Sequence, residues 1–211
     1  QVVKFNLDRK AERVRVFEIG RVFLRDPSSR NTDTTVEGFS QPMRVAAMAL
    51  GPSQPLQWDR KSRLVDFHDL KADLEALLAP RTAVFEPMEH PALHPGRSAR
   101  IVLDGRTVGC IGELHPRWRQ AYELPQAPVV FELDLDAALA RPVPQGRPVP
   151  RHQAVQRDIA VMVAESVTHA ALMKSIGSAP TGGLLRDAVL FDVYRPSQST
   201  AASAAAPGAG E

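Results

Sequence analysis

The side chains best suited to chemistry are grouped around one proline-interrupted segment. Glu86, Glu89, His90 and His94 lie within nine residues, and His115 follows a later strand-like stretch. Imidazole and carboxylate groups bind zinc and transfer protons, so a metal hydrolase using Glu89, His90, His94 and His115 is one hypothesis. Three prolines in the same segment forbid the helix that would put His90 and His94 on one face. Capping and turn-shaping roles are the alternative for these histidines.

Other arrangements for catalysis are missing from the sequence. Cys110 has apolar neighbours and no evident base, which favours a place in the core. Gly109 and Gly112 lack the lysine and the spacing of phosphate-binding loops, so we interpret them as strand-edge glycines. Asp134 and Asp136 share a strand face only if that strand continues, and the alternative is that Asp136 caps a helix. We therefore predict no catalytic residue in this chain.

Two sets of arginines could contact RNA phosphates or another subunit. One set lies on the first predicted strands, where the alternative is a solvated edge kept soluble by charge. The other lies near predicted strand ends late in the chain, where few aromatic residues favour phosphate and sugar contacts over base stacking. The members are Arg13, Arg15 and Arg21 in the first set, and Arg157, Arg186 and Arg195 in the second.

Composition limits the class of protein. The 211 residues are 44% hydrophobic, which is enough for a buried core, and the net charge is only +2. A single cysteine excludes an internal disulfide and favours a reducing, cytoplasmic location. No apolar run approaches the roughly 20 residues that span a bilayer, so we expect no membrane partner. The chain lacks an initiator Met and opens in an extended apolar pattern, which indicates a fragment of a longer polypeptide.

The elements that would position these residues form an α+β pattern with antiparallel strands around one long helix. Leucines at helical spacing predict that helix at 65–79, with Asp66 as its cap and Pro80 as its stop. Asp104-Gly105 predicts a hairpin, and 26–41 is predicted to be a loop. The remaining predictions are one bent strand or two at 13–24, strands at 43–50, 83–88, 97–103, 107–114 and 128–135, and short helices at 116–123 and 135–139.

A second domain follows a proline-rich linker at 140–151. Its pattern predicts a strand at 158–163, a helix at 168–176 capped by Thr168, and a strand at 184–194. The Ala/Ser/Pro/Gly-rich residues 197–211 cannot build a core and are predicted to be a disordered tail. A lone β-α-β piece has open edges, so we expect it to be marginally stable.

Several blocks carry a family resemblance, in the same order and at similar spacing. They read ERVRVFEIGRVF at 12–23, VDFHDLK at 65–71, HPALHPGRSA at 90–99, IGELHP at 111–116, VFELD at 130–134, AVQRDIA at 154–160 and LFDVYR at 190–195. Over about residues 3–196 the chain resembles the C-terminal part of the β subunit of bacterial phenylalanyl-tRNA synthetase.

This resemblance implies two parts. Residues 1–145 would be the later portion of a catalytic-like, inactive module with a class II synthetase-like antiparallel sheet, which packs on the catalytic α subunit. Residues 146–196 would be an incomplete ferredoxin-like anticodon-binding domain, with only the first β-α-β of a β-α-β-β-α-β fold. The segment Phe17-Glu18-Ile19-Gly20 stands where class II enzymes carry an ATP-binding arginine motif, so ATP binding is not carried over.

The implied activity is ATP-dependent attachment of phenylalanine to its tRNA by an α2β2 assembly. ATP and magnesium would be used by the α subunit, and no cofactor would be bound by this chain. We expect subunit contact at the first arginine set and tRNA contact at the second. The alternatives are a structural interaction module with no RNA role, and the metal hydrolase described above.

Overall fold

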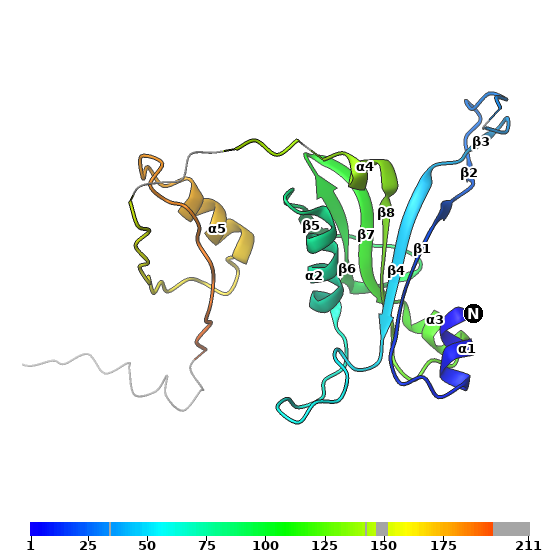
Figure 1. The fold of residues 1–211 in the computed structure, drawn as a ribbon, viewed down its shortest axis with the longest axis horizontal. Helices are drawn as coiled ribbons and strands as arrows, with labels where there is room; N and C mark the ends of the chain where they lie inside the picture. Colours follow the sequence, from blue (N-terminus) through cyan, green and yellow to red (C-terminus); the bar gives the residue numbers. More distant parts are fainter. Residues whose placement is uncertain (34, 142, 147–151, 196–211) are drawn as a thin grey trace, which may run out of the picture. The chain divides into compact units, whose positions relative to one another are not determined.

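The computed structural model describes residues 1–33, 35–141, 143–146 and 152–195. The chain divides into two units, residues 1–146 and 147–211 (Figure 1). The predicted tail at 197–211 and much of the predicted linker lie outside the described residues. Among the described helices, none is long and apolar enough to cross a membrane.

The first unit is built on one six-stranded sheet in which every neighbouring pair is antiparallel. This confirms the predicted antiparallel α+β pattern, including the strand at 43–50 with the predicted bounds. In spatial order the strands are β1 (Val14–Arg21), β4 (Met43–Leu50), β8 (Val129–Asp134), β7 (Arg106–Leu114), β6 (Leu93–Leu103) and β5 (Val84–Pro87).

Helix α2 (Phe67–Leu78) covers one face of this sheet. The Asp66 carboxylate accepts hydrogen bonds from the backbone N–H groups of His68 and Asp69, and the Asp69 carboxylate accepts one from the N–H of Asp66. This reciprocal arrangement is a capping box, which satisfies N–H groups that have no partner within the helix. The predicted helix and its cap are confirmed.

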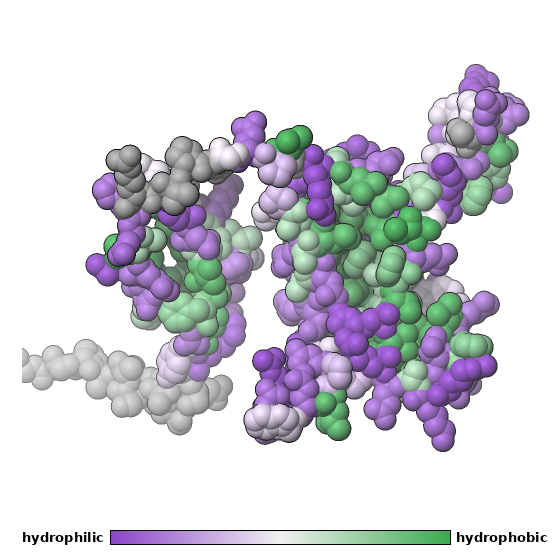
Figure 2. Space-filling model, in the orientation of Figure 1, coloured by the Kyte–Doolittle hydropathy of each residue, from purple (hydrophilic) through white to green (hydrophobic). Residues whose placement is uncertain are grey.

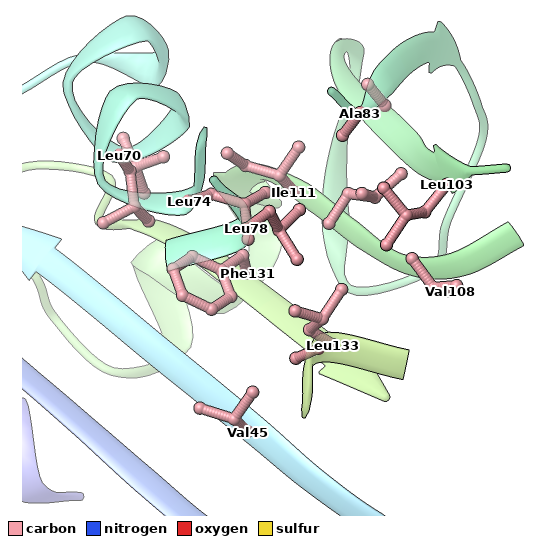
Figure 3. Close-up of a cluster of buried hydrophobic side chains, with 14 of the residues drawn as sticks. Val45, Leu70, Leu74, Leu78, Ala83, Leu103, Val108, Ile111, Phe131 and Leu133 are labelled. Atoms are coloured by element: carbon pink, nitrogen blue, oxygen red, sulfur yellow. The ribbon is translucent and has the colours of Figure 1, made fainter. Parts of the chain in front are cut away.

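The core lies between α2 and the sheet. Leu70, Leu74 and Leu78 lie on one side of the helix because they are four residues apart, and all three are buried. Figure 3 shows them directed toward Ile111 and Phe131 of the central strands. Burying each such side chain stabilises the fold by about 1.5–3 kcal/mol, so this layer fixes how the sheet and helix fit together.

The β6–β7 hairpin turns at Asp104 and Gly105, as predicted. Both residues have positive φ, 50° and 76°, which is the conformation that favours Asp-Gly in tight hairpins. Gly109 lies in β7, which pairs with β6 and β8, so the strand-edge interpretation of this glycine is wrong. A Cβ at Gly109 would lie 2.1 Å from the carbonyl oxygen of Glu132, and only glycine permits this approach.

A second, smaller core lies at one end of the sheet. The start of the chain, residues 1–6, was expected to be extended, but it lies largely in helix α1 (Val2–Asp8). Val3 and the half-buried Leu7 are one turn apart and pack with Leu50 and Leu124. This tertiary packing overrides the strand preference of the valines. Helix α3 (Pro116–Ala121) has a proline in its first turn, as predicted.

Helix α4 (Leu135–Leu139) is confirmed, but its cap differs from the prediction. The Asp134 carboxylate accepts from the N–H of Ala137 at 3.2 Å, whereas Asp136 lies inside the first turn. Because the helix begins at Leu135, the capping position is one residue before it.

Arg81 ties the end of α4 to the β6–β7 turn. Its Nη1 donates to the carbonyl oxygens of Ala137 and Ala140 at 2.7 and 2.6 Å. Its Nη2 lies 2.6 Å from the Asp104 carboxylate. Arg141 adds a hydrogen bond of 2.6 Å to the carbonyl oxygen of Leu77. These two side chains thus join three segments distant in sequence, namely the end of α2, the β6–β7 turn and α4.

Beyond β1 the chain forms a short arm, residues 22–42, that projects from the end of the sheet (Figure 1). The arm contains the two-stranded pair β2 (Leu24–Arg25) and β3 (Phe39–Ser40), and β3 lies within 26–41, where a loop was predicted. Thus 13–24 forms two strands, and Gly20 carries no bulge, because β1 pairs with β4 in unbroken register. The Asp26 carboxylate accepts hydrogen bonds from Ser28 and Ser29, and these bonds organise the turn after β2. The bonds from Ser28, and then that from Ser29, also lower the pKa of Asp26.

The second unit contains helix α5 (His169–Gly177), and the Thr168 hydroxyl caps it by accepting from the N–H of Ala171. The strands predicted at 158–163 and 184–194 are not formed. A split β-α-β arrangement places a further strand between its two parallel strands, and residues 152–195 supply none. The backbone of both segments therefore lacks a pairing partner within the described residues, and apolar side chains such as Phe191 stay exposed.

Candidate functional site

The histidines singled out from the sequence act on the local backbone. His90 Nδ1 accepts from the N–H of Ala92 at 3.2 Å, and His115 Nδ1 accepts from the N–H of Arg117 at 3.2 Å, at the start of α3. The third, His94, lies against the carbonyl oxygen of the residue that follows it. Within the described residues no three His, Cys, Asp or Glu side chains are grouped to hold a metal ion. The contacts are those of capping and turn-shaping histidines, and the metal-hydrolase hypothesis gains no support.

The face of the sheet opposite α2, here called the open face, carries a row of charged residues. Paired positions place Glu86, Arg100, Cys110 and Glu132 side by side across four strands. Arg100 Nε lies 2.6 Å from the Glu86 carboxylate, and Arg44 Nε lies 3.9 Å from that of Glu132. Acid and base side chains on this face thus pair with one another.

Cys110 sits in the middle of the open face. Burial is the main cause that raises the pKa of its thiol, and the nearby Glu132 carboxylate raises it further. The thiolate is the nucleophilic form, so a raised pKa makes this cysteine a weak nucleophile at neutral pH. The predicted place of Cys110 in the core is wrong, because the side chain lies half-buried on the open face and belongs to neither core cluster.

The three arginines expected to form a subunit contact each bind their own chain. Arg13 Nε donates to the carbonyl oxygen of Pro52 at 3.2 Å, and Arg21 Nη1 donates to that of Gln41 at 2.9 Å. Arg15 forms an ion pair with Asp73 on α2. A backbone carbonyl group is neutral and does not balance the positive charge of Arg13 or Arg21. Both side chains can therefore still attract an acidic surface.

Sequence reasoning missed the apolar side chains between these arginines. In β1, Phe17 is 73% exposed, Ile19 is 50% exposed and Val16 is 38% exposed. Figure 2 shows hydrophobic side chains gathered over the β4 and β1 side of the first unit. The signal was available in the run Val14–Arg21, whose apolar residues fall on both faces of the strand.

Among the described residues, no contact joins the three arginines of the second unit to one another. Arg195 Nη2 lies 2.7 Å from the Glu165 carboxylate, and Arg157 donates to the neighbouring carbonyl oxygen of Gln156 at 3.3 Å. Arg186 borders a hollow of about 600 Å³, which is also lined by Met173, Thr181, Gly182 and Gly183. Arg195 is therefore the most constrained of the three.

Comparison with known proteins decides the family. The model of the phenylalanyl tRNA synthetase beta chain CLM domain matches residues 1–135, and that of the ferredoxin-fold anticodon binding domain matches residues 150–206. The chain belongs to the phenylalanine–tRNA ligase beta subunit family. The family's two successive domain types thus correspond to the two units of the chain and confirm the resemblance found in the sequence.

Curated members of this family align with nearly all of the chain, and about half of the aligned residues are identical. The phenylalanine–tRNA ligase beta subunit of Burkholderia lata is 52% identical over 97% of this chain and 26% of its own length. That of Ralstonia nicotianae is 54% identical over 95% of this chain and 25% of its own. That of Dechloromonas aromatica is 49% identical over 90% and 23%. The chain spans about a quarter of the length of these curated relatives.

Proposed function

We propose that this chain supports the ATP-dependent attachment of phenylalanine to its tRNA without carrying out the chemistry itself. The observation that carries the proposal is the match of residues 1–135 to the CLM domain of the beta chain, together with side chains that pair with one another instead of forming a nucleophile and its base. Residues 1–145 would serve as the later part of a catalytic-like module with a class II synthetase-like sheet, in the cytoplasm.

The open face does not fit ATP and magnesium. A triphosphate needs cationic side chains or exposed backbone N–H groups that are free to receive it. Arg100 pairs with Glu86, Arg44 lies beside Glu132, and Glu18 adds a negative charge to the same face. We therefore assign ATP and magnesium to the α subunit of an α2β2 assembly and derive no step through them here.

Residues 146–196 would contribute to tRNA contact through Arg157, Arg186 and Arg195. The match of residues 150–206 to a ferredoxin-fold anticodon binding domain supports this assignment. Each arginine that neutralises a phosphate adds a salt-dependent share of the affinity. Subunit packing would fall to the first unit, at β1, which carries Arg15 and Arg21, and at Arg13 directly before it.

The test uses the β subunit that carries this sequence, assembled with its cognate α subunit. We expect Arg157→Glu combined with Arg195→Glu to weaken tRNA binding at low salt and to leave phenylalanine-dependent ATP–pyrophosphate exchange unchanged. Arg60→Glu combined with Lys61→Glu is the matched control, since it makes the same change of charge in the first unit. Unchanged tRNA affinity in the Arg157/Arg195 variant would favour a structural module with no RNA role.

A further inference from the structure

Arg195 differs from the other two arginines of the second unit in the charge that faces it. Its Nε and Nη2 both donate to the Oε1 atom of Glu165, at 3.0 and 2.7 Å. Arg157 donates to the neutral carbonyl group of Gln156, and Arg186 forms no ion pair within the described residues. The chain therefore supplies a counter-charge at Arg195 and leaves the other two positive charges available to an outside anion.

The ion pair joins two parts of the second unit that are distant in sequence. Glu165 lies three residues before Thr168, the cap of α5, and Arg195 lies thirty residues after Glu165. It is a tertiary contact, because neighbours in the sequence do not bring these two side chains together. A side chain proposed to receive RNA is thus held by a carboxylate of its own unit.

The geometry leaves this ion pair open to exchange. The side chain of Arg195 is 71% exposed and that of Glu165 is 81% exposed, so a phosphate group can reach both. A guanidinium has five N–H donors, and two of them are directed at Glu165. An incoming phosphate can therefore bind the remaining donors before the carboxylate leaves, and the positive charge is never without a partner.

We propose that Glu165 competes with the tRNA for Arg195: it holds the guanidinium in the free subunit, and a phosphate of the tRNA displaces it on binding. The inference rests on the proposed function, because it concerns the regulation of tRNA contact at this arginine. Carboxylate and phosphate oxygens accept hydrogen bonds from the same planar donor fork, so one can replace the other. The affinity for tRNA is lowered by the free energy of the pair that must open.

The competition also changes how tRNA binding depends on salt. An arginine that neutralises a phosphate releases counterions from the nucleic acid, and this release makes the affinity fall as salt rises. Arg195 together with Glu165 has no net charge, so the pair adds little to this release. Without the carboxylate charge, the same arginine adds the contribution of one phosphate contact.

The experiment measures the dissociation constant for tRNA, over a range of salt concentrations, with the β subunit that carries this sequence assembled with its α subunit. The test variant is Glu165→Gln, which removes the negative charge and keeps the length of the side chain. The matched control is Asp192→Asn, which removes one negative charge from an exposed residue of the same unit that forms no ion pair within the described residues. Glu165→Gln is also made together with Arg195→Gln, and thermal unfolding of every variant checks that the fold is kept.

We expect Glu165→Gln to lower the dissociation constant about two- to fivefold, the range measured for exposed ion pairs. The logarithm of its binding constant should also fall more steeply with the logarithm of the salt concentration, by about 0.7–0.9 in slope. Asp192→Asn should change the affinity clearly less. In the Arg195→Gln background, Glu165→Gln should have no effect.

Unchanged affinity and slope in the Glu165→Gln variant overturn the inference. An equal gain in the Asp192→Asn control, or a gain that persists in the Arg195→Gln background, also overturns it and assigns the effect to the overall charge of the unit. If Arg157→Glu combined with Arg195→Glu leaves tRNA binding unchanged, the proposed function fails first.

Discussion

Arg63 donates two parallel hydrogen bonds to the Asp69 carboxylate, from Nη1 to Oδ2 at 2.7 Å and from Nη2 to Oδ1 at 2.6 Å. The same carboxylate closes the capping box by accepting the N–H of Asp66 at 2.9 Å. The hydrogen bonds from Arg63 are the main cause that lowers the pKa of Asp69, and the backbone bond from Asp66 adds to the effect. The ionised Asp69 carboxylate thus joins Asp66 in stabilising the start of α2.

This contribution predicts a pH effect on stability. Because the pKa of Asp69 is lower in the folded chain, its contribution is complete above its unfolded pKa and is lost as the pH falls through the folded value. We expect Asp69→Asn to lower the melting temperature at pH 7, and the difference from the unchanged chain to shrink below about pH 4. Melting curves at pH 7 and pH 3 test this, and a difference that is the same at both would contradict it.

The cap itself gives a second prediction. Asp66→Ala removes the acceptor for two backbone N–H groups and should cost about 1 kcal/mol of unfolding free energy. Asp66→Asn keeps an acceptor oxygen and should cost less. Urea unfolding of the two variants measures the difference, and equal losses would mean that the hydrogen bonds do not supply the stabilisation.

Two leucines of α2 form a matched pair for the core. Leu74 is fully buried against the sheet, whereas Leu77 is 39% exposed. Leu74→Ala should destabilise the chain by about 2–5 kcal/mol, because it removes apolar contacts and leaves a cavity. Leu77→Ala should cost clearly less. Comparable losses at the two positions would show that burial against the sheet does not set the cost.

A pair of glycines tests backbone proximity. Gly109→Ala places a Cβ against the Glu132 carbonyl group and should cost roughly 1–3 kcal/mol or more through forced strand separation. A Cβ at Gly20 would meet nothing within 4 Å, so Gly20→Ala should be tolerated. Thermal melting followed by circular dichroism compares the stability of the two variants. A Gly109→Ala variant as stable as the unchanged chain would show that the β7–β8 pair can move apart.

Cys110 provides a chemical measurement. Burial and Glu132 raise the pKa of its thiol. We therefore expect iodoacetamide to alkylate Cys110 more slowly than it alkylates the thiol of glutathione at pH 8. Unfolding in urea should restore the normal rate. Alkylation of the folded chain at the glutathione rate would show that the open face is accessible and that the thiol is not suppressed.

The first unit was predictable where local signals agreed with one another. Helix α2 has a cap at Asp66 and leucines at helical spacing, and both signals act over a few residues. The β6–β7 hairpin needed only Asp104-Gly105 between two apolar runs. Such signals survive in the fold because tertiary packing favours the same conformation.

The failures occurred where distant contacts decide the conformation. Residues 2–8 have valines and a phenylalanine that favour strands, but Val3 becomes helical because it packs on Leu124 more than a hundred residues away. In the second unit the alternation at 158–163 and 184–194 predicted strands, yet a strand needs a neighbour. The arginines of β1 drew attention by their charge, although the exposed Phe17 and Ile19 distinguish that surface.

The anchoring of α4 by Arg81 has a practical consequence for protein engineering. With Ala137 and Ala140 both bound to one guanidinium, the carbonyl end of the helix is held by side-chain contacts as well as by its own backbone. A domain inserted between Ala137 and Ala140 would break these bonds. A fusion partner joined after Arg141 would leave them intact, so this is the junction we would choose for a tag or reporter.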